Sequence, residues 1–93
     1  MSDFELIQVA LRCKEDGNTK FRAGELKSAE GYYRDGISHL ETVKNDNKDL
    51  KELKVTLLQN LATVCNKSGD YKEAVRICTK ALAINNQSFK VLY

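Results

Sequence analysis

Apolar residues recur along the chain at steps of three and four, which is the spacing of one face of an α-helix. The pattern predicts four helical segments: one between Ser2 and Gly24, and others over about residues 28–44, 49–67 and 71–84. The positions expected to face inward are Leu6, Ala10, Cys13, Gly17 and Phe21; Ala29, Tyr33, Gly36, Leu40 and Val43; Leu50, Leu53, Leu57, Leu61 and Val64; and Tyr71, Ala74, Cys78 and Ala81. We therefore expect an all-α protein.

Glycine and Asn/Asp residues mark the ends of these segments, because the chain contains no proline. Ser2 and Glu5 have the spacing of a capping box, which satisfies free backbone N–H groups at a helix start. Gly24 and Gly69 suit the left-handed conformation just past a helix end. The polar clusters at residues 45–47 and 85–88 predict turns, and residues 88–93 then resemble the start of a further helix.

The pattern repeats after 45 residues. With this shift, small residues fall on small ones and larger apolar residues on larger ones: Gly17 on Ala62, Gly24 on Gly69, Leu26 on Tyr71, Ala29 on Ala74, Gly36 on Ala81 and Ile37 on Leu82. Small residues are expected where two helices approach closely, and larger ones where they fill the space between helices. The chain therefore contains a repeated helix-turn-helix unit.

Composition and charge narrow the function classes. The chain has 93 residues, of which 42% are hydrophobic and 30% charged, and its 15 Lys and Arg against 13 Asp and Glu give a net charge of +2. This balance is unlike that of a nucleic-acid-binding protein, and no apolar run approaches the roughly 18–20 residues that cross a bilayer. The acidic start lacks the basic region of a secretory signal. We expect a cytoplasmic protein that binds neither nucleic acid nor a membrane.

Candidate residues for catalysis or metal binding are few. Cys13, Cys65 and Cys78 do not have the spacing of a zinc site or a disulfide framework, so we expect reduced cysteines that serve as small core residues. His39 is the only histidine, and the second predicted helix places it at the surface. The sequence thus predicts no catalytic residue, no metal site and no cofactor.

At the repeated positions the chain resembles the tetratricopeptide repeat (TPR), a family of helix-turn-helix arrays. The residues that carry this resemblance are Gly17, Asn18, Phe21, Gly24, Leu26, Ala29, Tyr33, Gly36 and Ile37, and again Ala62, Gly69, Asp70, Tyr71, Ala74, Cys78, Ala81 and Leu82. The resemblance implies an α-α superhelix with two units, over about residues 3–44 and 49–84, and an incipient helix at 88–93. Residues 1–93 would form a single domain of a larger protein.

Two features depart from a typical repeat. A typical repeat has about 34 residues, so the 45-residue repeat of this chain is about 11 residues longer. Eleven residues are close to three helical turns, so lengthened second and third helices would keep their packing faces in phase. Glu41 and Asn86 stand where the family commonly has proline. The long helices, Leu53-Lys54-Val55 and the stretch from Asp70 to Leu82 resemble the TPR domains of large FKBP-type immunophilins. These are peptidyl-prolyl isomerases whose isomerase activity would lie in a separate domain.

Lys14, Asn18, Asn60 and Lys90 match the carboxylate clamp of chaperone-binding TPR domains, position by position. Lys14 and Asn18 lie one helical turn apart on the first helix, Asn60 on the third, and Lys90 near the chain end. The resemblance implies that they bind the acidic C-terminal tail of a heat-shock chaperone, of the 90-kDa class or the 70-kDa class. The family's clamp arginine would follow directly after Tyr93. Phe21, Gln59 and Thr63 are expected to line the groove, although Phe21 also fits the core.

Two other functions remain open at this point. An enzyme would need a nucleophile with its base or a metal cluster, and the sequence shows neither. A general TPR scaffold would recognise an internal helix or another TPR protein instead of a chain terminus. In addition, the apolar end of the array predicts self-association through the exposed C-terminal packing face.

Overall fold

Four α-helices make up the part of the chain that the structure describes. The computed structural model describes residues 2–43 and 48–89, with side chains as far as Ile84. The helices are α1 (Asp3–Arg22), α2 (Leu26–Glu41), α3 (Lys48–Lys67) and α4 (Tyr71–Phe89). The predicted all-α class is confirmed.

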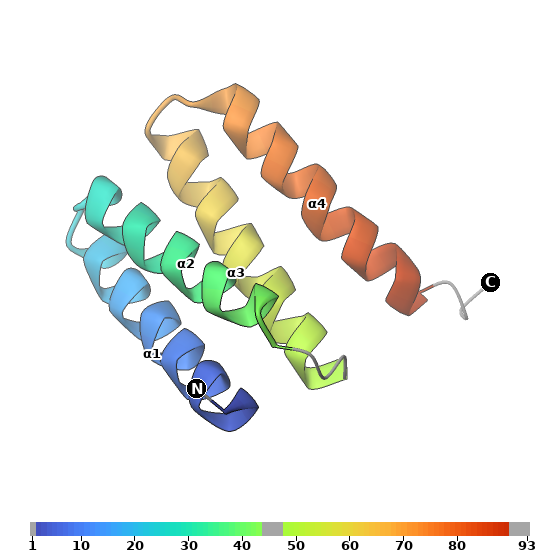
Figure 1. Ribbon diagram of the computed structural model, residues 1–93. Helices are drawn as coiled ribbons and strands as arrows, with labels where there is room; N and C mark the ends of the chain where they lie inside the picture. The colour runs from blue at the N-terminus through green and yellow to red at the C-terminus, as the bar shows by residue number, and fades with distance from the viewer. Residues whose placement is uncertain (1, 44–47, 90–93) are drawn as a thin grey trace.

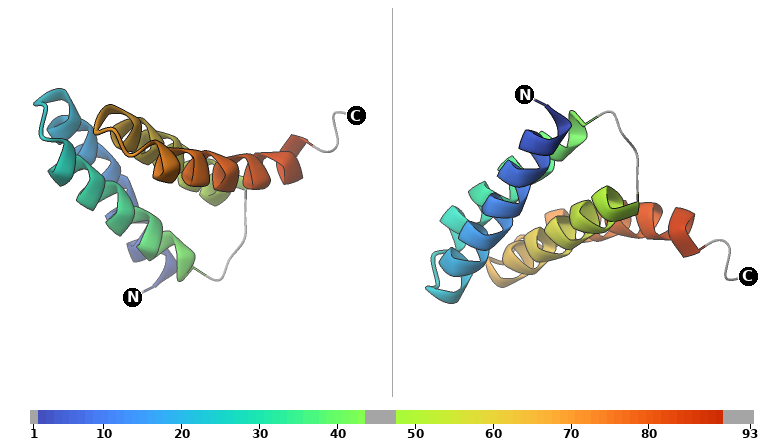
Figure 2. Two further views of the ribbon diagram at one scale, coloured as in Figure 1. Left: turned by 90° about the horizontal axis from the view of Figure 1, so that it is seen from above. Right: turned by 90° about the horizontal axis from the view of Figure 1, so that it is seen from below.

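The helices pack in consecutive pairs, α1 with α2 and α3 with α4, and α2 joins the pairs by packing against α3 (Figure 1). The two pairs diverge from the ends that carry their short turns, as both views of Figure 2 show. The extents of 36 × 34 × 17 Å correspond in the thinnest direction to about two helix layers of roughly 10 Å each. This is the arrangement of two TPR-type helix-turn-helix units.

The predicted helix boundaries are confirmed where the sequence carries capping residues. The Glu5 backbone N–H donates to the Ser2 hydroxyl at 3.2 Å, and the Glu5 carboxylate accepts from the Ser2 backbone N–H at 3.1 Å. Gly24 and Gly69 follow α1 and α3 with φ values of +82° and +89°. Because side chains disfavour positive φ, glycine is the residue that ends a helix this way with least strain.

Other boundaries differ from the prediction. α2 begins at Leu26 instead of Ser28 and ends at Glu41, where the Thr42 hydroxyl donates to the His39 carbonyl at 2.7 Å. The turn expected at residues 85–88 is absent, since α4 continues through Phe89. That stretch has neither glycine nor proline, and asparagine costs a helix only about 0.7 kcal/mol relative to alanine. Ser88 and Phe89, expected to start a new helix, therefore end α4, and residues 90–93 lie outside the described part.

The core lies between the two helix pairs, and its most central side chains include Tyr33, Leu57, Leu58 and Ile77, each at most 2% exposed. Three helices meet at Gly36. A Cβ atom there would lie 3.1 Å from Cβ of Cys13 in α1 and 3.2 Å from Cδ1 of Leu57 in α3. The small residue therefore permits the close approach that the repeat pattern predicted.

The inward face of α4 was predicted only in part. Ala74 and Ala81 are buried as expected, but Tyr71 is 64% exposed and Ile77 takes the core position assigned to Cys78. Cys78 is exposed, so the prediction of a core cysteine is wrong there, whereas Cys13 and Cys65 are buried. From Ala74, a step of three to Ile77 and a step of four to Cys78 both fit helical spacing, and the larger apolar side chain occupies the core.

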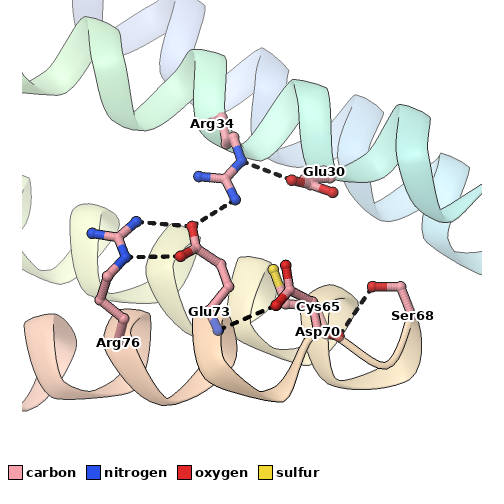
Figure 3. Close-up of polar contacts among 7 residues, drawn as sticks. All are labelled: Glu30, Arg34, Cys65, Ser68, Asp70, Glu73 and Arg76. Carbon is pink, nitrogen blue, oxygen red and sulfur yellow. Dashed lines mark hydrogen bonds and ion pairs between the residues drawn. The ribbon is translucent and has the colours of Figure 1, made fainter.

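A cluster of charged residues links α2 to α4 across the two pairs (Figure 3). Arg34 donates to Glu30 at 2.9 Å and to Glu73 at 2.8 Å, and Arg76 donates two hydrogen bonds of 2.8 Å to the same Glu73 carboxylate. Hydrogen bonds from Arg76 and Arg34 lower the pKa of Glu73 to about 2 from an ordinary value of 4.5. Glu73 is thus the acceptor shared by two arginines at the junction of the helix pairs.

We expect the stabilising effect of Glu73 to disappear in acid. Because its pKa is lower in the folded chain than in the unfolded chain, its contribution is complete above about pH 4.5 and is lost as the pH falls toward about 2. Urea unfolding of the wild type and of Glu73→Gln should therefore differ at pH 7, and the difference should shrink across that range. Glu15→Gln is the matched control on exposed α1 surface and should track the wild type. A Glu73→Gln difference that is constant from pH 7 to pH 2 would contradict this assignment.

Candidate functional site

The first part of the candidate site is one face of α1. Lys14, Asn18 and Phe21 follow each other at steps of four and three, so they lie in one row along the helix. Lys14 is half-buried and forms no hydrogen bond or ion pair with any residue of the described ranges. None of these residues therefore competes with a ligand for its ammonium group.

The second part is the adjacent face of α3. The Asn60 side-chain N–H donates to Oδ1 of Asn18 at 3.3 Å, and the Lys67 ammonium lies 5.7 Å from the centre of the Phe21 ring. Both contacts join α1 to α3, and in the view from below these two helices lie in front of α2 and α4 (Figure 2, right). Asn60 and Lys67 are seven residues apart, two helical turns, so the rows on α1 and α3 run side by side.

Asn18 is held from a third helix as well. The hydroxyl of Tyr33 in α2 donates to Oδ1 of Asn18, and the Tyr33 side chain is only 1% exposed. The ring reaches α1 because residue 17 is glycine: a Cβ atom at that position would lie 2.5 Å from Cε1 of Tyr33. The apolar spacing predicted Tyr33 only as a core residue. A tyrosine at a buried position was itself a clue, because a buried hydroxyl usually has a hydrogen-bond partner.

The remaining predicted residues have separate positions. Phe21 is half-buried and packs against the core, as its second interpretation expected. Gln59 and Thr63 are exposed on α3, where the Thr63 hydroxyl donates to the Gln59 carbonyl at 3.0 Å. Lys90 lies outside the described residues. The structure therefore brings Asn18 and Asn60 into direct contact and places Lys14 one turn from Asn18.

The chemistry of this arrangement is that of hydrogen-bond donation to an anion. Oδ1 of Asn18 accepts two hydrogen bonds, and within the described residues no acceptor takes Nδ2 of Asn18 or the second N–H of Asn60, so both remain as donors. Amide donors do not repel a neighbouring ammonium group, so the two kinds of group can act on one ligand. Donors of these kinds can hydrogen-bond to a carboxylate, which has about four acceptor sites.

Other reactive groups in the described residues lie apart from this site or are unreactive. Burial and the neighbouring Asp35 carboxylate raise the pKa of the Cys13 thiol to about 11, so it remains protonated. His39 lies partly exposed on α2, with Nδ1 2.8 Å from the Asp35 carbonyl. Within residues 2–43 and 48–89, no three metal-ligating side chains come together, and no helix is long and apolar enough to cross a bilayer.

The chain is similar in sequence to segments of known proteins. The chain is 31% identical over all 93 residues to FK506-binding protein 59 of Drosophila melanogaster. It is 33% identical over 91 residues to the mitochondrial import receptor subunit TOM70 of Homo sapiens. The chain spans only 21% of the first protein and 14% of the second. Neither a protein-family profile nor a solved structure matches it.

Both similarities cover nearly the whole chain, and the two sequence identities are almost equal. The chain is thus distantly similar to segments of both proteins, and its paired helices are consistent with two TPR-type helix-turn-helix units.

Proposed function

We propose that the adjoining faces of α1 and α3 bind the acidic C-terminal peptide of a partner protein. The observation that carries this proposal is the contact between Asn18 and Asn60. It brings together amide groups from two helices, one helical turn from Lys14, whose ammonium has no partner within the described residues. A terminal aspartate supplies two carboxylates within one residue, which matches a cluster of donors from separate helices. Lys90 would add a second ammonium group from the end of the chain.

The partner that fits this proposal best is a heat-shock chaperone that ends in an acidic tail, of the 90-kDa class or else the 70-kDa class. Charge-assisted hydrogen bonds contribute about 1.5–3 kcal/mol each. Three or four of them, less the cost of ordering the peptide, correspond to micromolar affinity, or about −8 kcal/mol. The similarity to an FK506-binding protein favours a co-chaperone whose isomerase domain lies elsewhere in the protein. The similarity to an import receptor subunit favours a general scaffold as the alternative.

Calorimetric titration distinguishes these functions. A free-acid Met-Glu-Glu-Val-Asp peptide should bind with micromolar affinity, and its C-terminal amide at least about tenfold more weakly, because one charge-assisted contact is worth about 1.5 kcal/mol or more. Added salt should weaken the binding of the free-acid peptide. Equal binding of the acid and the amide would favour the scaffold that recognises an internal segment.

Self-association remains a second proposal for the same chain. Tyr71, Val75 and Leu82, each more than 60% exposed, follow one another along α4 at helical spacing, with the exposed Cys78 between them. Sedimentation should show concentration-dependent association of the wild type. Leu82→Lys should weaken it at least about tenfold, because burying a leucine is worth about 1.5–3 kcal/mol.

The matched control for this surface is Phe4→Lys, since Phe4 is 60% exposed on α1 and lies outside the α4 row. This variant should associate like the wild type. Equal loss of association in both variants, or a monomeric wild type at every concentration, would rule out the α4 surface as the contact.

A further inference from the structure

The geometry around Asn18 depends on a residue that does not reach the proposed peptide. Tyr33 is buried between α1 and α2, with its ring against the backbone of Gly17 and its hydroxyl hydrogen-bonded to Oδ1 of Asn18. Burial raises the pKa of this hydroxyl above its usual value. It therefore stays protonated, and able to donate, throughout the neutral range.

Fixing one end of a planar amide fixes the other. Oδ1 of Asn18 has two lone-pair directions, and the Tyr33 hydroxyl and the Asn60 N–H occupy both. Within the described residues no acceptor takes the Nδ2 hydrogens of Asn18. An asparagine without these partners could rotate its side chain by 180° and present its oxygen to an incoming carboxylate, which would repel it.

We propose that Tyr33 is a positioning residue for the peptide site: its hydroxyl holds the Asn18 amide with the nitrogen turned toward the ligand. This inference rests on the proposed function and extends it to a residue of α2. It also explains why the site contains a tyrosine where a phenylalanine would fill the same space. Helix α2 thereby sets the orientation of a polar side chain on α1.

The variant Tyr33→Phe tests this proposal, because it removes the hydroxyl and keeps the ring. We expect its affinity for the free-acid peptide to fall about threefold to tenfold, the range of one lost hydrogen bond. Tyr32→Phe is the matched control, since Tyr32 is the adjacent residue of α2 and is 36% exposed. It should bind like the wild type.

A double-mutant cycle separates positioning from general loss of packing. In an Asn18→Ala background, Tyr33→Phe should cause no further loss of affinity, because the side chain that it positions is gone. A loss of the same size in both backgrounds would mean that the hydroxyl acts through overall stability, and would overturn the proposal.

The side-chain amide resonances of Asn18 provide a readout that does not require peptide. In the free wild type and in Tyr32→Phe they should show a single ordered conformer, and in Tyr33→Phe an averaged one. Unchanged resonances in Tyr33→Phe would overturn the positioning role of Tyr33, whatever the peptide titrations show. Equal binding of the free acid and its amide by the wild type would instead defeat the proposed function alone.

If Tyr33→Phe does not fold, nuclear magnetic resonance of the wild-type protein tests the inference instead. A slowly exchanging Tyr33 hydroxyl proton with nuclear Overhauser contacts to the Asn18 side chain is expected, and its absence at low temperature would overturn the inference.

Discussion

Replacing Asn18 by alanine is expected to lower the affinity for the free-acid peptide by about tenfold to a hundredfold, the range of one charge-assisted hydrogen bond of about 1.5–3 kcal/mol. In the proposed site Asn18 would supply a donor to the ligand, and it also accepts the hydrogen bond that holds Asn60. Its loss therefore removes one ligand contact and loosens a second. Affinity for the C-terminal amide should hardly change, and calorimetry with both peptides measures the difference.

Lys14→Ala and Asn66→Ala show whether the loss of peptide affinity arises at the site itself or from lower stability. Asn18→Ala leaves the buried Tyr33 hydroxyl without its partner, so some loss of stability is expected. Lys14 has no partner in the described ranges, so Lys14→Ala should weaken free-acid binding with an unchanged unfolding midpoint. Asn66→Ala, on the exposed end of α3, is the matched control and should bind normally. Wild-type affinity in both Lys14→Ala and Asn18→Ala would remove the functional assignment.

The second large effect concerns stability. Gly17→Ala should destabilise the fold by about 1–3 kcal/mol, the usual cost of overpacking a core. The added Cβ atom would lie 2.5 Å from Cε1 and 2.7 Å from Cδ1 of the buried Tyr33 ring, which must then move away from α1. This cost outweighs the roughly 1 kcal/mol by which alanine is the better helix former. Urea unfolding followed by circular dichroism measures the change.

Gly31→Ala is the matched control for this substitution. Gly31 lies inside α2, exposed, and apart from its chain neighbours and the nearby backbone of α2, no atom lies within 4 Å of the position that a Cβ would occupy. Only the helix-propensity gain applies there, so this variant should be more stable than the wild type by up to about 1 kcal/mol. Effects of the same sign at Gly17 and Gly31 would show that Tyr33 does not pack as closely as described.

The architecture could be predicted from the sequence because its strongest constraints are local. The apolar spacing and the two glycines after α1 and α3 each depend on only a few neighbouring residues, and the 45-residue repeat shows the same local pattern twice. Predictions failed where only a polar cluster suggested a boundary, as at residues 85–88, because asparagine and serine weaken a helix without breaking it. They also failed where helical spacing allowed either of two residues to face the core, as with Ile77 and Cys78, because packing between helices determines which one is buried.

The candidate site was predictable in its residue types but not in its internal contacts. Lys14, Asn18 and Asn60 were identified by resemblance, and the structure shows that the two asparagines touch. The hydrogen bond from Tyr33 could not be predicted from spacing, because it depends on how closely α2 approaches α1 at Gly17. The contribution of Lys90 stays a prediction.

Nuclear magnetic resonance of the side-chain amides during titration with the free-acid peptide tests directly whether amide and ammonium groups of α1 and α3 bind a terminal carboxylate. We expect the Nδ2 resonances of Asn18 and Asn60 to shift together and saturate at one dissociation constant, with little change for the same titration of the C-terminal amide. Shifts confined to α2 and α4, or identical shifts with both peptides, would contradict the account.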